Sequence, residues 1–356
     1  MKMNIMLILA LAMPMVMING NAADTKVAPE ISKAFFADLA QKAADAEKAN
    51  VSVVRGKDNW LFISSELKSL GVGAEFWGEN AAKVSHVATP DAQDSLAAIV
   101  DFKKQCDKAG VELILVPVPE KSIIYPEMIS DTVKSTDGTV PRLDIYHEKF
   151  YSVLKENGVK VLDLTPTFLQ HRNDAAGGMF CHTDTHWSPQ ACVLVAKMLG
   201  DDIKSRPWYK DIAKKKYETV VRDAEVTGDL AGMLADQAIG KEKLKMTVVQ
   251  ERTAAGLTPV DTWRESPIVL LGDSHNLIFH GGDDMLYVGA GLVDNLAMNL
   301  GFPVDLVAVR GSGATPARKN LARRKDNLAG KKLVIWCFTT REFTEGQGWA
   351  KVNVVK

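Results

Sequence analysis

The stretch Ser266-Pro267-Ile268-Val269-Leu270-Leu271-Gly272-Asp273-Ser274-His275-Asn276 decides the fold that we expect for this chain. Its first half is an apolar run containing β-branched residues, which is typical of a strand buried on both faces of a parallel sheet. A serine just after such a strand lies on a tight turn at the carboxyl edge of the sheet, where its hydroxyl is accessible. The stretch therefore predicts an α/β fold with Ser274 as a candidate nucleophile.

A serine hydroxyl is a weak nucleophile, so it needs a base and a group that orients that base. The segment Cys181-His182-Thr183-Asp184-Thr185-His186-Trp187-Ser188-Pro189 contains both. We predict that His186 removes the proton from Ser274 and that Asp184 holds the imidazole of His186. Each motif also has a purely structural interpretation, because Gly-Asp-Ser is common in turns and Ser-Pro is a typical helix start.

The two motifs together resemble the alginate O-acetyltransferase family of bacterial exopolysaccharide systems, the AlgJ and AlgX proteins. In ordinary SGNH hydrolases the Gly-Asp-Ser block comes first, whereas here the acid and base precede the serine with Asp-x-His spacing, as in that family. The resemblance runs from about Gly56 to about Phe343. Its supporting pieces are Gly56-Lys57-Asp58-Asn59-Trp60-Leu61-Phe62, Val116-Pro117-Val118-Pro119-Glu120-Lys121, Gly228-Asp229-Leu230 and Trp336-Cys337-Phe338-Thr339-Thr340-Arg341-Glu342.

The resemblance implies an SGNH hydrolase-like (flavodoxin-like) three-layer sandwich with a mostly parallel sheet and a rearranged motif order. It implies an O-acetyltransferase that acetylates an exported, alginate-like polysaccharide through an acetyl-serine intermediate, without a cofactor. The implied partners are the polysaccharide and a membrane-bound O-acyltransferase that supplies acetyl groups. A carbohydrate acetylesterase, which would pass the acetyl group to water through the same triad, is the open alternative.

The oxyanion donors are harder to assign. The backbone N–H of Ser274 is one candidate, and Gly311 and Gly313 are others, because glycines after a strand let the backbone approach a ligand closely. The resemblance adds Arg341 as a residue that stabilises the nucleophile turn, contacts the polysaccharide or forms a salt bridge. We also consider Lys121, which follows an expected strand, as an oxyanion or substrate-binding residue.

A metal-dependent phosphoesterase is a further alternative, because several potential ligands alternate along the two motifs. These ligands are His182, Asp184, His186, Asp273 and His275. The Asn-His and Asp-Arg signatures expected of that class are missing, so we predict no metal. The cysteines do not form a Cys-x-x-Cys pair either.

Four cysteines in an exported chain allow three pairings. Cys181 and Cys192 flank the expected acid and base, so a bridge between them would stiffen that loop. Cys106 and Cys337 lie in apolar segments and are equally consistent with buried free thiols.

The chain begins with a segment typical of a secretory signal at residues 1–23, with Lys2 followed by an apolar core and small residues. Cleavage would place the protein in the periplasm, and an uncleaved inner-membrane anchor is the alternative. A formal net charge of -1 argues against nucleic-acid binding, which normally needs a basic surplus.

We divide the remaining chain into an N-terminal helical segment (24–55), a catalytic domain (56–345) and a tail (346–356). Alternating strand and helix patterns predict a mostly parallel sheet between helical layers. The expected strands are 112–118, 160–164, 267–272, 305–309 and 332–338. The expected helices are 28–50, 91–109, 143–157, 189–204 and 314–324. The section 206–262 departs from this alternation, and we interpret it either as an inserted lid beside the active edge or as an extra packing layer.

Overall fold

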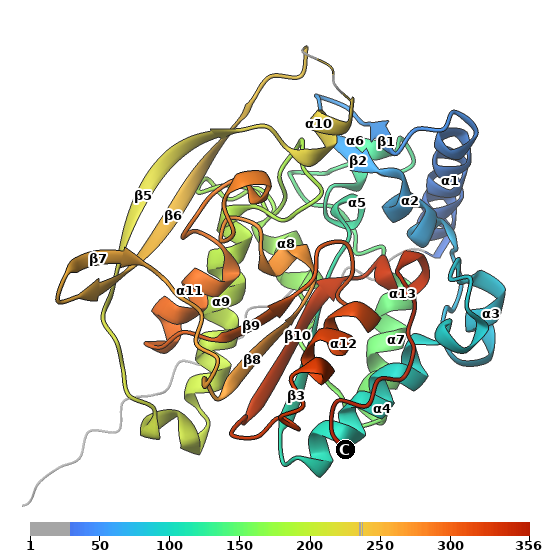
Figure 1. The fold of residues 1–356 in the computed structure, drawn as a ribbon. Helices are drawn as coiled ribbons and strands as arrows, with labels where there is room; N and C mark the ends of the chain where they lie inside the picture. Colours follow the sequence, from blue (N-terminus) through green and yellow to red (C-terminus); the bar gives the residue numbers. More distant parts are fainter. Residues whose placement is uncertain (1–28, 235, 237) are drawn as a thin grey trace, which may run out of the picture.

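Five parallel strands form the central sheet of the computed structural model, which describes residues 29–356 apart from 235 and 237 (Figure 1). Their order across the sheet is β4 (Lys160–Val161), β3 (Glu112–Val118), β10 (Leu333–Thr339), β8 (Ile268–Gly272) and β9 (Asp305–Ala308). β10 pairs with β3 on one side and with β8 on the other, so Trp336 lies between Leu115 and Leu271. The predicted α/β fold with a mostly parallel sheet is confirmed, and all five carboxyl ends meet at one edge.

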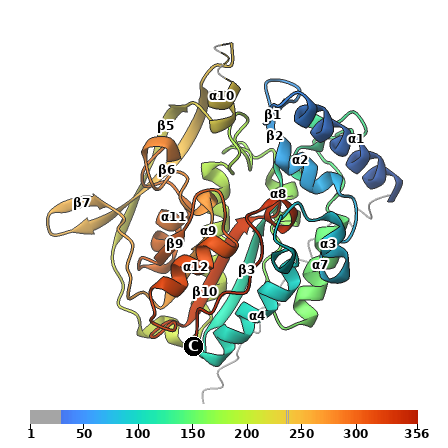
Figure 2. The same ribbon diagram turned by 45° about the vertical axis from the view of Figure 1, so that its right-hand side comes forward.

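Two helical layers cover the sheet because successive side chains of each strand point to opposite faces. Ile114, Leu270 and Ile335 pack in one core with α9 (Pro189–Lys204) and α11 (Leu292–Leu300). Leu271 and Trp336 pack in a second core on the other face. The helices of this second layer are α4 (Ser95–Lys108), α7 (Ile145–Glu156) and α12 (Thr315–Arg323), as Figure 2 shows.

Most of the expected elements agree with the structure to within two residues, and two differ by more. The helix expected at 91–109 begins at Ser95, because residues 90–92 form a separate 3-10 turn and Asp94 caps the helix. The strand expected at 160–164 ends at Val161, because Asp163 Oδ1 accepts a hydrogen bond from Thr165 N (3.0 Å) and turns the chain into α8 (Thr165–His171). Outside the section 206–262, the other α-helices of the described residues are α1 (Pro29–Lys48), α2 (Ser64–Gly71), α3 (Ala81–Val84), α5 (Lys121–Ile124), α6 (Pro126–Ile129) and α13 (Glu342–Glu345).

The section 206–262 contains a second, antiparallel sheet. Its strands are β5 (Tyr217–Val226), β6 (Glu242–Thr253) and β7 (Gly256–Pro259), and α10 (Asp229–Leu234) lies between the first two. Met246 and Val248 of β6 join the core of α9 and α11, so this sheet is a packing layer over those helices. The turn that leads into α10 reaches the candidate site instead, as described below.

The two ends of the described chain differ from the division expected from the sequence. The boundary at residue 55 falls inside a hairpin, because β1 (Val53–Arg55) pairs with β2 (Leu61–Ile63). Part of the expected tail belongs to the core, because Trp349 is only 1% exposed and packs against Trp336 (5.6 Å between ring centroids).

The predicted signal segment, residues 1–23, lies outside the described residues. In the part of the chain that the structure describes, no helix combines the length and the apolar character that a membrane crossing requires. All four cysteines are buried free thiols, so the bridge between Cys181 and Cys192 is not formed. Burial raises the pKa of each thiol, which disfavours the reactive thiolate.

Candidate active site

The nucleophile turn begins where β8 ends. Gly272 is required there, because a Cβ atom at this position would lie 1.7 Å from the carbonyl oxygen of Cys337 on β10. Asp273 then caps a single 3-10 turn over residues 274–276. Asn276 Nδ2 donates hydrogen bonds to Asp273 O (3.2 Å) and Cys337 O (2.8 Å), which fixes the turn against the central strand. Ser274 is 8% exposed at this position.

The acid–base loop, residues 182–186, precedes α9 and faces the nucleophile turn. Ser188 is the N-cap of α9 and accepts a hydrogen bond from Ala191 N (3.2 Å), so the expected helix start fixes one end of the loop. The structure brings Asp184, His186 and Ser274 together. His186 Nε2 lies 2.7 Å from Ser274 Oγ, and His186 Nδ1 lies 2.6 Å from Asp184 Oδ1.

The Asp-x-His spacing has a local reason. Asp184 Oδ1 accepts the backbone N–H of His186 (2.9 Å) as well as bonding its ring, so one carboxylate fixes both the main chain and the imidazole. With Nδ1 turned toward Asp184, Nε2 is the ring atom that faces Ser274. This arrangement holds the tautomer in which Nε2 can accept a proton.

The charges of the pair support each other in a buried setting. Burial opposes ionisation of Asp184. The ring of His186 and the backbone N–H groups of His186 and Asp229 favour the charged carboxylate more strongly, so the pKa of Asp184 is lowered to about 2. Burial likewise disfavours the imidazolium form of His186, yet Asp184 and other carboxylates outweigh burial and raise the pKa of His186. The site therefore stabilises the protonated histidine that proton transfer from Ser274 would create.

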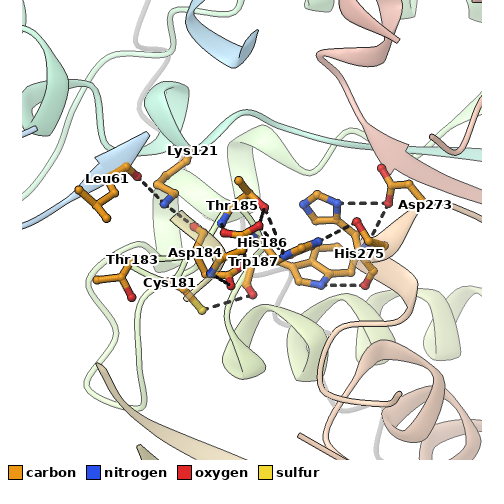
Figure 3. A network of polar contacts seen from close by, with 12 residues as sticks. Leu61, Lys121, Cys181, Thr183, Asp184, Thr185, His186, Trp187, Asp273 and His275 are labelled. Atoms are coloured by element: carbon orange, nitrogen blue, oxygen red, sulfur yellow. Dashed lines mark hydrogen bonds and ion pairs between the residues drawn. The ribbon is translucent and has the colours of Figure 1, made fainter. Parts of the chain in front are cut away.

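A second Asp-x-His pair flanks Ser274. Asp273 Oδ1 accepts from His275 N (2.9 Å) and lies 3.2 Å from His275 Nδ1, while Asp273 Oδ2 accepts from Thr339 N (2.8 Å). Burial disfavours the charged form of His275 more than Asp273 favours it, so the pKa of His275 is lowered. The rings of His275 and His186 are 4.9 Å apart, so a neutral imidazole borders the candidate base (Figure 3).

The ligands of the metal alternative do not form one group. His182 stacks on Trp60 at 4.1 Å between ring centroids and lies apart from the potential ligands that converge. Among the described residues, the three potential ligands that converge are Asp184, His186 and Asp229. All three already hydrogen-bond to protein groups.

Lys121 lies beneath the acid–base loop. Its Nζ donates to the carbonyl oxygens of Leu61 (2.8 Å) and Asp184 (2.5 Å), and the residue is only 1% exposed (Figure 3). The prediction that Lys121 binds an oxyanion or substrate is therefore wrong. A single ammonium group with three donors instead ties the loop to β2.

Gly311 and Gly313, which follow β9, lie in different surroundings. Gly313 N donates to Glu342 Oε1 (2.5 Å), and Ser312 Oγ donates to Glu342 Oε2 (2.7 Å), so the N–H of Gly313 is not free to bind an oxyanion. The prediction for Gly313 is wrong for that reason. Gly311 is exposed with φ of +80° in the left-handed region, which makes it a turn residue. The N–H of Ser274 stays as the oxyanion donor that we predict.

Arg341 follows β10 at the same edge of the sheet. It is half-buried at the N-cap of α13, and its charge lies close enough to His275 to contribute to the lowered pKa of that histidine. Stabilisation of the nucleophile turn, contact with the polysaccharide and a salt bridge all stay predictions for Arg341.

Two carboxylates that sequence reasoning missed hold the acid–base loop from the inserted section. Glu242 accepts hydrogen bonds from the N–H groups of His182 (2.9 Å) and Thr183 (3.1 Å). Asp229 Oδ1 accepts a hydrogen bond from the N–H of Thr185 (2.7 Å). The only sequence signal was the Gly228-Asp229-Leu230 motif, in which Gly228 is needed because a Cβ atom there would lie 2.2 Å from Thr183 O.

Comparison with known proteins places the chain in a family. Residues 53–340 match the family model described as "SGNH hydrolase-like domain, acetyltransferase AlgX". The chain is 26% identical over 302 residues to the probable alginate O-acetylase AlgJ of Pseudomonas aeruginosa, covering 81% of this chain and 70% of the relative. It is 25% identical over 309 residues to the alginate biosynthesis protein AlgX of Pseudomonas putida, covering 80% of this chain and 58% of the relative.

A solved structure has a similar fold. The O-acetyltransferase domain of Pseudomonas putida AlgJ superposes with a TM-score of 0.59 at 22% identity, covering 82% of this chain and 92% of that domain. AlgX of Pseudomonas aeruginosa superposes with a TM-score of 0.53 at 16% identity, covering 81% of this chain and 62% of that structure. These likenesses support the SGNH hydrolase-like architecture.

Proposed function

The chain belongs to the AlgX family of acetyltransferases with an SGNH hydrolase-like domain, and we propose that it transfers acetyl groups to hydroxyls of an acidic polysaccharide through an acetyl-serine on Ser274. The observation that carries this proposal is the unbroken hydrogen-bonded chain from Ser274 Oγ through His186 to Asp184. In a family of O-acetyltransferases, such a chain provides a nucleophile, its base and the group that orients the base.

In the first half-reaction, His186 Nε2 takes the proton of Ser274 Oγ while that oxygen attacks the acetyl carbonyl of the donor. The carbonyl oxygen becomes negative, and the N–H of Ser274 at the start of the turn is the donor that we assign to it. The tetrahedral intermediate then breaks the bond to the donor, and His186 returns the proton to the leaving oxygen. Ser274 now carries the acetyl ester.

The second half-reaction repeats these steps in reverse order. His186 takes the proton of an acceptor hydroxyl, and the acceptor oxygen attacks the acetyl carbonyl on Ser274. Ser274 Oγ leaves and takes the proton from His186, so the free enzyme is restored. Water competes at this stage, and a transferase outruns it only if the sugar hydroxyl is bound in line with the ester.

A cleft beside the acid–base loop is our candidate for the acceptor. It has a volume of about 470 Å³ and is lined by residues that include Gly177, His182, Gln190, Lys243 and Lys245. Glu242 also lines it, but its carboxylate is bound to the N–H groups of His182 and Thr183. The two lysines come from β6 of the inserted section. Their charge and the polar loop suit an acidic sugar chain, which supports a polyuronate such as alginate as the substrate class.

We propose that the protein works after export, in the periplasm. The basic and apolar pattern of residues 1–23 supports this location. A membrane-bound O-acyltransferase that supplies the acetyl group is the partner that we propose, and the resemblance to the alginate acetylation proteins AlgJ and AlgX supports it.

The test separates acetylation of the serine from transfer to sugar. With an activated acetyl ester and an acidic oligosaccharide, we expect mass spectrometry to detect acetyl on the Ser274 peptide and an acetylated oligosaccharide. Ser274→Ala should abolish both and leave the fold unchanged, because losing a hydroxyl at this turn opens no core cavity.

The contrary outcomes are distinct. Rapid acetate release without acetylated sugar, across alginate fragments and other acidic oligosaccharides, would identify an acetylesterase. Undiminished transfer by a well-folded Ser274→Ala protein would remove Ser274 as the nucleophile.

A further inference from the structure

Asp229 makes three hydrogen bonds to the acid–base loop. Its backbone N–H donates to Asp184 Oδ2 (2.8 Å), while its carboxylate accepts Thr185 N at Oδ1 (2.7 Å) and Thr185 Oγ1 at Oδ2 (2.6 Å). Asp184 Oδ1 already serves His186, so Asp229 satisfies the oxygen of the acid that faces away from the base. Both carboxylate oxygens of Asp184 are thereby held in one orientation.

Asp229 can act in this way because its own position is fixed. Leu230, the next residue, is fully buried against Val53 and Leu61 of the β1–β2 hairpin. The N–H of Ala231 donates to Thr183 O (3.1 Å), so the first turn of α10 is bound to the loop two residues after Asp229. Gly228 allows the chain to approach the loop backbone closely enough for these contacts.

The charge of Asp229 also reaches the base. Asp229 Oδ2 lies 4.0 Å from His186 Nδ1, and the Asp229 side chain is 31% exposed. The other groups that act on His186 are Asp184, which bonds the ring, Asp273 on the nucleophile turn, and the neutral ring of His275. Asp184 and Asp229 both favour the imidazolium, whereas burial opposes it.

Two cations lie farther out and do not face the ring directly. Lys121 donates to the backbone carbonyl oxygen of Asp184, and the charge of Arg341 helps to lower the pKa of His275. The nearest charged groups around the His186 imidazole are therefore carboxylates, and Asp229 is the one that comes from the inserted section. A negative charge this close stabilises the imidazolium that forms as Ser274 loses its proton.

We propose that Asp229 is a positioning residue of the reaction: it fixes the Asp184–His186 pair and places a second carboxylate beside the imidazolium. This inference rests on the proposed function in one respect, namely that the Ser274–His186–Asp184 chain performs the acetyl transfer. It gives the inserted section a part in catalysis besides packing and acceptor binding. Asp229 acts through Asp184, Thr185 and His186.

The test compares two substitutions at Asp229 that remove different contributions. Asp229→Asn keeps the backbone N–H to Asp184 and an amide oxygen for Thr185, and removes the charge. Asp229→Ala removes the side-chain bonds as well. We expect kcat for an activated acetyl ester to fall about fivefold in Asp229→Asn, since the hydrogen bonds lose their charge assistance. A fall of about 10- to 100-fold is expected in Asp229→Ala, where the loop loses its anchor.

The pH profile distinguishes this role from a structural one. In Asp229→Asn the pKa of His186 should fall, because a negative charge beside the imidazolium is gone, and the acid limb of the kcat/KM profile should move to lower pH with it. Asp223→Asn is the matched control, because it makes the same charge change on an exposed position of β5. Glu242→Gln is the second control, because it weakens the hold on His182 and Thr183 at the far end of the same loop.

Histidine titration by NMR gives the same information without turnover. The proposal is overturned if the pKa of His186 in Asp229→Asn equals that in Asp223→Asn, or if Asp229→Ala keeps full activity. It is also overturned if Glu242→Gln lowers the pKa of His186 as much as Asp229→Asn does. If Ser274→Ala stays active, the proposed function fails, yet the NMR titration still decides whether Asp229 controls the charge of His186.

Discussion

At the scale of single residues, the sequence identified groups whose chemistry is concentrated in short motifs. Asp184, His186 and Ser274 lie in patterns whose spacing reflects local turns, since each aspartate accepts the backbone N–H two residues further on. Lys121 and Gly313 were misassigned because a position after a strand does not reveal which neighbours occupy it. Their partners, Asp184 O and Glu342, are distant in the sequence.

The raised pKa of His186 predicts the pH dependence of the reaction. The base must be neutral to take a proton, and the surrounding carboxylates raise the pKa of His186 above its ordinary value of 6.5. Activity should therefore rise with pH through a midpoint above 6.5 and be lost as pH falls through it.

Asp184→Asn tests the cause of this midpoint. Without the carboxylate, the midpoint should move to lower pH, and the rate at its plateau should drop by about 10³-fold or more because the imidazole loses its orienting partner. The measurement is kcat/KM for an acetyl ester from pH 5 to pH 9. An unchanged midpoint in Asp184→Asn would show that another group limits the rate.

At the scale of elements, apolar runs predicted the parallel strands well because both faces of each strand are buried. α11 was not predicted, because it has only 9 residues and a segment this short does not show a clear helical period. β5 escaped because its middle residues are exposed, so it shows no alternation of apolar and polar side chains. In the 206–262 section, β6 packs on α9 and α11 as a layer, and the turn before α10 contacts the acid–base loop, while a lid over the site stays a prediction.

The position of β6 predicts a role in acceptor binding. Lys243 and Lys245 line the cleft beside the acid–base loop, and neither contacts Ser274 in the proposed first half-reaction. Replacing both with Ala should raise KM for an acidic oligosaccharide about 5- to 30-fold, since each cation near an anionic sugar contributes about 0.5–1 kcal/mol. Turnover of a small acetyl ester should stay within about twofold, because it needs only the triad.

Lys216→Ala is the control for this experiment, because Lys216 is exposed and lies outside the cleft. The effect of the double substitution should shrink at high salt, which screens exposed charges. Equal KM values for Lys216→Ala and the double variant would place acceptor binding elsewhere on the molecule.

At the scale of the whole molecule, the last residues complete the core next to the nucleophile turn. The ring of Trp349 lies 5.3 Å from that of Phe338 and 5.7 Å from that of Phe343, measured between centroids. Its Nε1 donates to the carbonyl of Glu342 (2.7 Å). The sequence suggested a tail here because a segment this short shows no periodicity, and only the fold reveals the partners of its aromatic side chain.

Loss of Trp349 should therefore affect both stability and the site. Trp349→Ala removes a ring that is 1% exposed, which predicts a loss of about 3–5 kcal/mol in the free energy of unfolding. The effect should extend to the site, because Trp349 contacts Glu342 and Glu342 also holds the N–H of Gly313. Gly313 packs closely on the nucleophile turn, since a Cβ atom there would lie 2.8 Å from Asp273 N.

Urea denaturation of Trp349→Ala, compared with Val221→Ala at a 64% exposed position, measures the loss in the free energy of unfolding. If both variants unfold at the same urea concentration, the C-terminal residues do not stabilise the domain. If Trp349→Ala is destabilised as expected, its residual acetyl-ester activity under native conditions should also fall, because the nucleophile turn rests on the loop that Glu342 anchors.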